Sequence, residues 1–514
     1  MADDSRIPFL RLRGGAPPRW AAIALAAGVL GDLLLRGGPP GLGATLWAWT
    51  LIGLALYLRS GARRPERTDL ALAGMAAAAA AVFPLRAAPA LALLAAGLLF
   101  LGAAAAVLDA PRRSGALAWI LALVTAGVSA AGMAVLGLVG SARRPEGEPA
   151  GGGRRIGVAL RGALLAAPFL LVIGSLFVSA DPVFARYFQA ILDLGLEEAA
   201  SHVLVSFLLA WVAGGLLYGI ARVALADPRV GPGAAGRAAG EVVVALVLID
   251  LLFGGFLAVQ ARTLFGGREF VEATAGLSYA EYARGGFFQL VVAAAIALPA
   301  VLAADWLVPL GEPRRRAFLG VAALLVGLVL AVLASAAHRM GLYLEAYGPS
   351  EARIYATTFM VWLAVSGALL YGTVLRDRRE SFPALSLAAG WVAVLALAVL
   401  DPAALVVRAQ AERARDPTGF DARYATSLGA DAAPALLAAL DGVDPESRCA
   451  IARSLIERWA DPPAPDWRTW NLARWTARRS VGASEAELRE TTRNCPAPAR
   501  PARGGTDPPP SGRR

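Results

Sequence analysis

Long apolar stretches, separated by short clusters of Arg, Pro or Gly, fill the first 400 residues of the chain. About 20 helical residues cross a bilayer core about 30 Å thick, because an α-helix rises about 1.5 Å per residue. The pattern predicts an all-α fold, a polytopic transmembrane helix bundle with about twelve spans, plus or minus one. The predicted spans are 20–35, 43–58, 69–85, 88–108, 115–139, 156–178, 201–225, 241–259, 286–308, 317–337, 354–375 and 383–400.

Composition supports a chain embedded in lipid. Hydrophobic residues make up 57% and charged residues 17% of the 514 residues, and the mean hydropathy is +0.56. Stretches such as 88–108 and 317–337 are apolar on every side of a helix, whereas helices of soluble proteins keep a polar face. The lipid bilayer is therefore the expected partner.

Arginine-rich loops predict the orientation, because such loops stay in the cytoplasm. The loops at 140–155, 222–240, 309–316 and 376–380 hold 13 arginines in 48 residues, whereas those at 178–200, 260–286 and 338–353 hold 6 in 66. The first set should be cytoplasmic, in a bacterial plasma membrane, and the region after Leu400 extracytoplasmic. The arginines of 1–19, 59–69 and 109–113 also favour the cytoplasm, which requires an odd number of spans.

The composition becomes polar after residue 400, which predicts a small helical domain around amphipathic runs at 431–441 and 447–459. Both cysteines, Cys449 and Cys495, lie there, as a disulfide or as two free thiols. We divide the chain into a cytoplasmic segment (1–19), N-terminal transmembrane helices (20–140), a Gly/Arg-rich cytoplasmic linker (141–155), a main transmembrane domain (156–400), a helical extracytoplasmic domain (401–495) and a disordered tail (496–514).

Several function classes lack the residues they need. All 49 basic residues are arginine, so a Walker A loop and a Schiff-base lysine are excluded. The net charge of +10 lies in loops between apolar runs rather than along one face, so we expect no nucleic acid partner. His202 and His338 are isolated, no hydrolase motif occurs, and we expect neither a metal nor a cofactor.

Charged residues inside predicted spans are candidate functional residues, because a charge in a bilayer is costly. Asp250 is the strongest candidate, in the middle of its span, and could handle a proton or a cation. The alternative is a structural hydrogen bond to a neighbouring helix. Asp305 and Asp32 raise the same question, but both lie near a span end and could reach water.

Polar residues also gather in three loops of the predicted outer side, where together they could line a cavity for a cationic or sugar-like ligand. The alternative for the middle loop is an interfacial helix with aromatic anchors. The candidate residues are Asp181, Glu272, Tyr279, Glu281, Tyr282, Arg284, Glu345, Tyr347 and Arg353.

Three of these stretches carry a family resemblance: SADPVF at 179–184, SYAEYARGGFFQL at 278–290 and YLEAYGPSEARIYA at 343–356. With DPAALVVRAQAER at 401–413 and LGADAAPALLAAL at 428–440, the chain resembles the bacterial multi-pass membrane family called domain of unknown function (DUF) 4173, related to DUF 4153. The resemblance implies no catalytic residue. Pro349 departs from the family pattern and puts the start of the local helix in doubt.

Three functional hypotheses follow. The leading one is a non-enzymatic envelope or signalling component that displays its C-terminal domain to an envelope protein outside the cytoplasm. The alternative is a transporter or flippase that uses the intramembrane carboxylates. The third is a membrane enzyme with Asp181, Glu272 or Glu281 as its acid or base. Nothing in the sequence indicates an oligomeric state.

Overall fold

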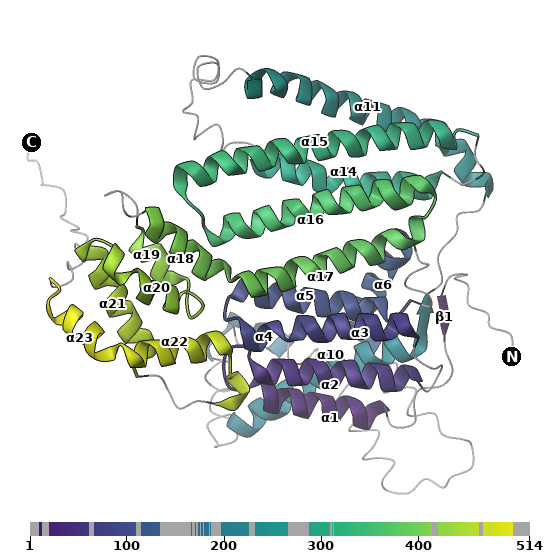
Figure 1. The fold of residues 1–514 in the computed structure, drawn as a ribbon. Coiled ribbons are helices and arrows are strands. Elements are labelled where there is room, and N and C mark those ends of the chain that lie inside the picture. The colour runs from purple at the N-terminus through teal and green to yellow at the C-terminus, as the bar shows by residue number, and fades with distance from the viewer. Residues whose placement is uncertain are drawn as a thin grey trace, which may run out of the picture. The chain divides into compact units, whose positions relative to one another are not determined.

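Helices form almost all of the part of the chain that the computed structural model describes (Figure 1). The structure describes residues 10–12, 20–60, 66–108, 115–133, 197–225, 232–265, 287–308, 311, 313–413, 420–461 and 466–496, with isolated positions between 166 and 186. The chain divides into two compact units. We call residues 1–402 with 465–473 the membrane unit, and residues 403–464 with 474–514 the C-terminal unit.

The described part of the membrane unit consists mainly of apolar helices. They are α1 (Trp20–Leu35), α2 (Leu42–Ser60), α3 (Arg67–Ala80), α4 (Val82–Leu85), α5 (Pro89–Ala105), α6 (Ala116–Val128), the π-helical η2 (Ser129–Met133), α10 (Glu197–Arg222), α11 (Pro232–Phe265), α14 (Phe287–Leu307), α15 (Arg315–Tyr347), α16 (Glu351–Thr373) and α17 (Phe382–Leu400). Two short 3-10 turns, η3 (Val374–Arg376) and η4 (Arg379–Ser381), join α16 to α17.

Eight of the described helical stretches are long and apolar enough to cross a membrane, as in a multi-pass membrane protein. They correspond to eight of the predicted spans. Three further predicted spans coincide with shorter apolar helices, namely α1, α5 and α6 with η2. The predicted span 156–178 lies mostly outside the described residues, so the prediction of about twelve spans stays a prediction.

One end of the membrane unit gathers segments that adjoin arginine-rich loops. The strand β1 (Leu10–Leu12) pairs antiparallel with β2 (Val223–Leu225), in a register that sets Leu10 opposite Leu225. Leu108 also bridges to Leu225, and Arg59 donates a hydrogen bond to the Leu108 carbonyl at 3.0 Å. Leu10–Leu12, Arg59, Leu108 and Leu225, which lie in or next to segments that the sequence assigns to one side, thus lie together.

Two helix groups make up the membrane unit. In one group, α11, α14, α15 and α16 enclose a core that includes Phe318, Val329 and Leu370. In the other, α1 packs along α10, where Gly214 leaves room for Ala24 on the facing helix. Small residues allow this close approach without side-chain interlocking, which is how helices associate in lipid. Because α17 packs against α3, α5 and α16, it connects the groups. The predicted division between 20–140 and 156–400 stays a prediction.

The C-terminal unit has a core of its own. It contains α18 (Pro402–Arg413), α19 (Ala422–Ser427), α20 (Ala433–Ala439), η5 (Leu440–Gly442), α21 (Pro445–Trp459), most of α22 (Leu472–Ala483), and α23 (Glu485–Arg493). Ile451, Leu455, Val481 and Leu488 are fully buried, as the amphipathic pattern requires. The sequence treats 401–495 as one continuous domain, whereas residues 465–473 belong to the membrane unit.

Candidate functional site

Asp250 is a buried carboxyl group in the interior of a membrane helix. It lies ten residues before Gln260, the end of the apolar stretch Ala239–Gln260, and therefore about 15 Å from that end. Only 6% of Asp250 is exposed, and among the described residues neither carboxylate oxygen has a hydrogen-bond partner. The side chain shares the face of α11 on which Leu246 packs against α15. No described residue therefore provides the hydrogen bond from a neighbouring helix that the structural alternative for Asp250 requires.

A second polar group lies farther along the contact of α11 with α15. With the amide of Gln260 oriented so that its oxygen faces α15, that oxygen accepts hydrogen bonds from Ser335 Oγ at 2.6 Å and Arg339 Nη2 at 2.7 Å. All three side chains are at least nine-tenths buried. The α11–α15 contact thus carries polar groups at two depths, of which only Asp250, the deeper one, was a candidate from the sequence.

Asp305 is fully engaged in a structural ion pair. Its Oδ1 accepts a hydrogen bond from Arg315 Nη2 at 2.6 Å, and its Oδ2 lies 3.5 Å from Arg379 Nη1. Arg315 also donates to Asp377 Oδ1 at 2.8 Å and to the Val308 carbonyl at 3.0 Å. These bonds join the end of α14 to the start of α15 and to the α16–α17 connection, so Asp305 holds helix ends together.

Asp32 also has partners, and they come from two helices. Arg36 donates to Asp32 Oδ1 through Nη2 at 2.6 Å, and His202 Nδ1 is hydrogen-bonded to Asp32 Oδ2. Arg36 further donates to Ser201 Oγ at 2.9 Å. The sequence analysis read His202 as isolated and did not single out Arg36. The i, i+4 spacing of Asp32 and Arg36 was a usable signal, whereas the contact with His202 depends on the packing of α1 against α10.

Residues 466–471, which we call the strap, return from the C-terminal region to the membrane unit. The strap includes η6 (Trp467–Thr469) and lies against the ends of α1, α2 and α4. Arg468 donates to the Leu33 carbonyl at 2.9 Å, and the Trp470 carbonyl accepts from the Leu42 amide at 2.9 Å. Asn471, 1% exposed, donates to the carbonyls of Phe83 and Arg86, each at 2.8 Å.

Glycines make room for the strap. A Cβ atom added to Gly41 would lie 2.5 Å from the Trp470 carbonyl oxygen and 2.7 Å from the Thr469 carbonyl carbon, so only glycine fits there. The pKa of Asp466 is lowered by hydrogen bonds from Arg468, first from its side chain and then from its backbone amide. The strap is thus a built contact of the membrane unit, at the end where Arg86 pairs with Asp401.

The candidate outer cavity stays a prediction, because the structure describes only some of its residues. Glu272, Tyr279, Glu281, Tyr282 and Arg284 lie outside the described residues. Glu345 and Tyr347 are exposed at the end of α15, and exposed Asp181 accepts from the Val183 amide at 2.7 Å.

Arg353 has a role in the turn from α15 to α16. Its guanidinium lies 4.1 Å from the centre of the Tyr343 ring and donates to the carbonyls of Tyr347 and Gly348. Gly348 has φ +71°, a conformation that favours glycine, and Pro349 lies in the turn before α16 begins at Glu351. The proline therefore interrupts no helix.

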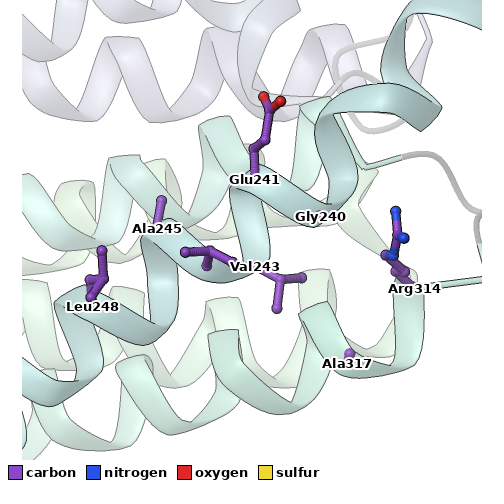
Figure 2. Close-up of a pocket in the computed structure, with 8 residues that line it drawn as sticks. Gly240, Glu241, Val243, Ala245, Leu248, Arg314 and Ala317 are labelled. Carbon is purple, nitrogen blue, oxygen red and sulfur yellow. The ribbon is translucent and has the colours of Figure 1, made fainter.

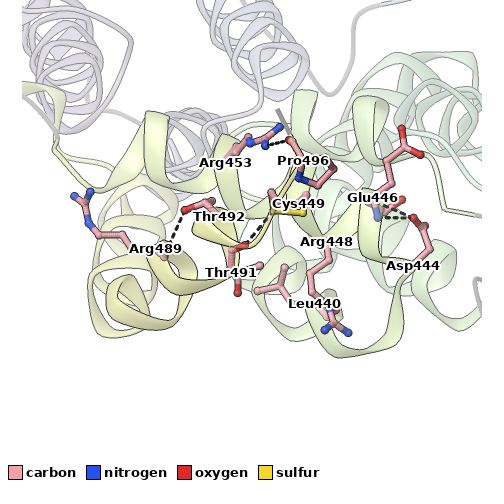
Figure 3. The surroundings of a disulfide bond; sticks show 12 residues. Leu440, Asp444, Glu446, Arg448, Cys449, Arg453, Arg489, Thr491, Thr492 and Pro496 are labelled. Atoms are coloured by element: carbon pink, nitrogen blue, oxygen red, sulfur yellow. Dashed lines mark hydrogen bonds between the residues drawn. A yellow bond between two sulfur atoms is a disulfide. The ribbon is translucent and has the colours of Figure 1, made fainter. Parts of the chain in front are cut away.

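The two cysteines are joined in the C-terminal unit. Cys449 of α21 and Cys495, which follows α23, form a disulfide with their Cα atoms 5.8 Å apart (Figure 3). Asp444 caps the start of α21, because its Oδ1 accepts from the amides of Glu446 and Ser447 at 3.0 and 2.9 Å. Hydrogen bonds from Ser447, from its hydroxyl and then its amide, lower the pKa of Asp444.

Among the described residues, no three His, Cys, Asp or Glu side chains are grouped to hold a metal ion. The described part of the membrane unit contains Asp250, a buried carboxyl with no hydrogen-bond partner there, and the strap, which is hydrogen-bonded to α1, α2 and α4.

Comparison with known proteins assigns the chain to a family whose function is unknown. Neither the curated proteins nor the solved structures contain a match. The model of the family described as "Domain of unknown function (DUF4153)" matches residues 70–439, which is well over half of the chain. The protein therefore belongs to the DUF4153 family.

Proposed function

We propose that this protein is a non-enzymatic component of a bacterial envelope, whose membrane unit displays the C-terminal unit outside the cytoplasm. The observation that carries the proposal is the strap. Because residues 465–473 belong to the membrane unit, the chain passes between the two units three times, after Pro402, after Ala464 and after Ala473. A membrane protein whose extramembrane region was a simple tail would need only one connection.

The C-terminal unit has features suited to a partner protein. Trp475 is 46% exposed, and the Arg479 guanidinium lies 5.2 Å from the centre of its ring. Tryptophan and arginine are the residues that most often dominate binding energy at protein interfaces. We infer that this pair on α22 contacts an envelope protein.

The extracytoplasmic location rests on two observations that point the same way. The arginine distribution places the region after Leu400 outside, and a disulfide between Cys449 and Cys495 is stable in an oxidising compartment. We further propose the finer assignment to DUF 4173 within this group of families, on the stretches at 179–184, 278–290 and 343–356.

Cysteine labelling in intact cells tests the location. A membrane-impermeant maleimide should label Cys449 and Cys495 only after reduction. Labelling without reduction would retain the outside location and remove the disulfide, and labelling only after lysis would place the C-terminal unit in the cytoplasm and overturn the proposal.

Complementation of a deletion strain tests display itself, scored as resistance to detergent or osmotic stress of the envelope. The double variant Trp475→Ser/Arg479→Ser should fail to restore resistance, while the control Arg489→Ser, also on an exposed surface and paired with Glu485, should restore it. Full restoration by the double variant, at equal expression, would remove the inferred contact.

Asp250 favours a second candidate function, a transporter or flippase coupled to a proton or cation. A carboxyl without a partner inside a membrane helix is a functional candidate by default, because its burial costs stability. In the same complementation assay, Asp250→Asn should abolish function if Asp250 binds the coupling ion. Under the display proposal, Asp250→Asn should restore resistance fully.

A further inference from the structure

An open groove of 830 Å³ lies between α11 and the start of α15 (Figure 2). Its floor and one wall are apolar, formed by Val243, Val244, Ala245, Leu248 and Ala317, and its end is lined by Gly240, Glu241 and Arg314. Val244 and Leu248 are 60% and 62% exposed, so they face the lipid rather than the protein core. The groove is therefore largely apolar and has one acidic and one basic side chain at its end.

The two charged side chains of the groove are free to meet a ligand. Both are exposed, and the described residues supply neither an ion pair nor a hydrogen bond to either side chain. Figure 2 shows them on different sides of the groove end, with Glu241 directed away from Arg314. The next residue, Arg315, is by contrast buried and engaged with Asp305 and Asp377.

Gly240 keeps Arg314 in place at the groove. A Cβ atom added to Gly240 would lie 3.3 Å from Arg314 Nη1, which is tighter than ordinary contact. The guanidinium thus rests against the backbone of α11, with its fork of donors available. A planar guanidinium binds phosphate oxygens through paired, charge-assisted hydrogen bonds.

We propose that this groove binds a zwitterionic phospholipid of the phosphatidylethanolamine class. Arg314 binds the lipid phosphate, Glu241 binds its ammonium group, and an acyl chain lies along Val244 and Leu248. The position suits a lipid, because the charged end lies at the end of the membrane stretch Ala239–Gln260 and the apolar wall continues into it. Glu241 disfavours a headgroup of net negative charge, which selects the zwitterion.

Native mass spectrometry of the purified full chain tests the proposal, with palmitoyl-oleoyl phosphatidylethanolamine and palmitoyl-oleoyl phosphatidylglycerol titrated at matched concentrations. We expect the wild-type protein to retain the ethanolamine lipid in preference. Arg314→Gln should lower its retention about tenfold, the effect of losing one charge-assisted contact. The matched control Arg316→Gln, at an exposed arginine two residues away, should leave retention unchanged.

Two further variants separate the groups of the groove. Glu241→Gln should shift the binding preference toward the glycerol lipid. Gly240→Val should lower the retention of both lipids, because the added side chain displaces Arg314. Thermal unfolding of each variant checks that the fold is intact.

Defined outcomes would overturn the proposal. They are equal retention by Arg314→Gln and the wild type, or a wild-type preference for the glycerol lipid. A dimer that Arg314→Gln dissociates without a change in lipid retention would instead identify the groove as an interface between two copies of the chain.

Discussion

Replacing Asp250 by an apolar residue should stabilise the membrane unit. Both carboxylate oxygens lack partners among the described residues, and the side chain is 6% exposed. A buried polar group without a hydrogen bond costs about 1–3 kcal/mol. Valine has one side-chain heavy atom fewer than aspartate, so Asp250→Val removes this cost without opening a large cavity or overpacking the α11–α15 contact.

The gain should therefore be about 1–3 kcal/mol in the free energy of unfolding, which corresponds to about a fivefold to hundredfold change in the unfolding equilibrium. The gain should fall in the lower part of this range if the β-branched valine packs less well at position 250 than the aspartate it replaces. The value does not include a hydrophobic gain, because lipid is as apolar as the helix interface.

Reversible unfolding of the full chain in mixed detergent micelles measures this change, followed by circular dichroism. Asp250→Asn is the matched control, because its amide keeps the shape and still lacks partners, so it should gain less than Asp250→Val. A loss of 1 kcal/mol or more in Asp250→Val would mean that the carboxyl has a stabilising partner and would refute the reasoning. A stabilised variant that also loses function in cells would identify Asp250 as a residue that serves function at the expense of stability.

Three further predictions concern the strap and the C-terminal unit. Gly41→Val should displace the strap and speed trypsin cleavage after Arg468 at least about tenfold. The control Gly53→Val, where an added Cβ meets nothing within 4 Å, should leave the cleavage rate unchanged. Equal cleavage rates in the two variants would contradict the strap contact. Cys449→Ser opens a loop with a sequence separation of 46 and should destabilise the C-terminal unit by about 4 kcal/mol in the chain-entropy estimate, seen as lost protease resistance; unchanged resistance would show that the bridge adds nothing. Asp444→Ala should cost about 1 kcal/mol at pH 7. Folding lowers the pKa of Asp444, so the ionised carboxylate stabilises the unit at pH values above the unfolded pKa of about 3.9, and this stabilisation is lost as the pH falls through the folded pKa. The stability cost of Asp444→Ala should therefore fade in denaturation at pH 3. A cost that persists at pH 3 would exclude a cap by the ionised carboxylate.

Helix positions were readable from the sequence because each helix in a membrane satisfies its backbone within itself. The predicted spans 20–35, 317–337 and 383–400 begin or end within a few residues of α1, α15 and α17, except that α15 continues to Tyr347. His338 and Arg339 ended the apolar pattern before α15 itself ended.

Site partners were much less predictable. Asp250, Asp305 and Asp32 have the same sequence signature, a carboxylate in an apolar run, yet their surroundings differ. Asp305 meets Arg315 and Arg379, Asp32 meets Arg36 and His202, and Asp250 meets no described partner. Sequence periodicity gives the face of a helix, but the identity of the facing helix depends on packing.

The sequence by itself determined that this is a multi-pass membrane protein and where most of the described helices lie. Apolar length and arginine clustering carry that information, because transfer between water and lipid acts on each segment separately. Only the tertiary structure decided that residues 465–473 return to the membrane unit, that the glycine-rich turn near Gly41 receives them, and that Arg314 is free while Arg315 is engaged. Such contacts join residues hundreds of positions apart, and they depend on close packing that no local pattern encodes.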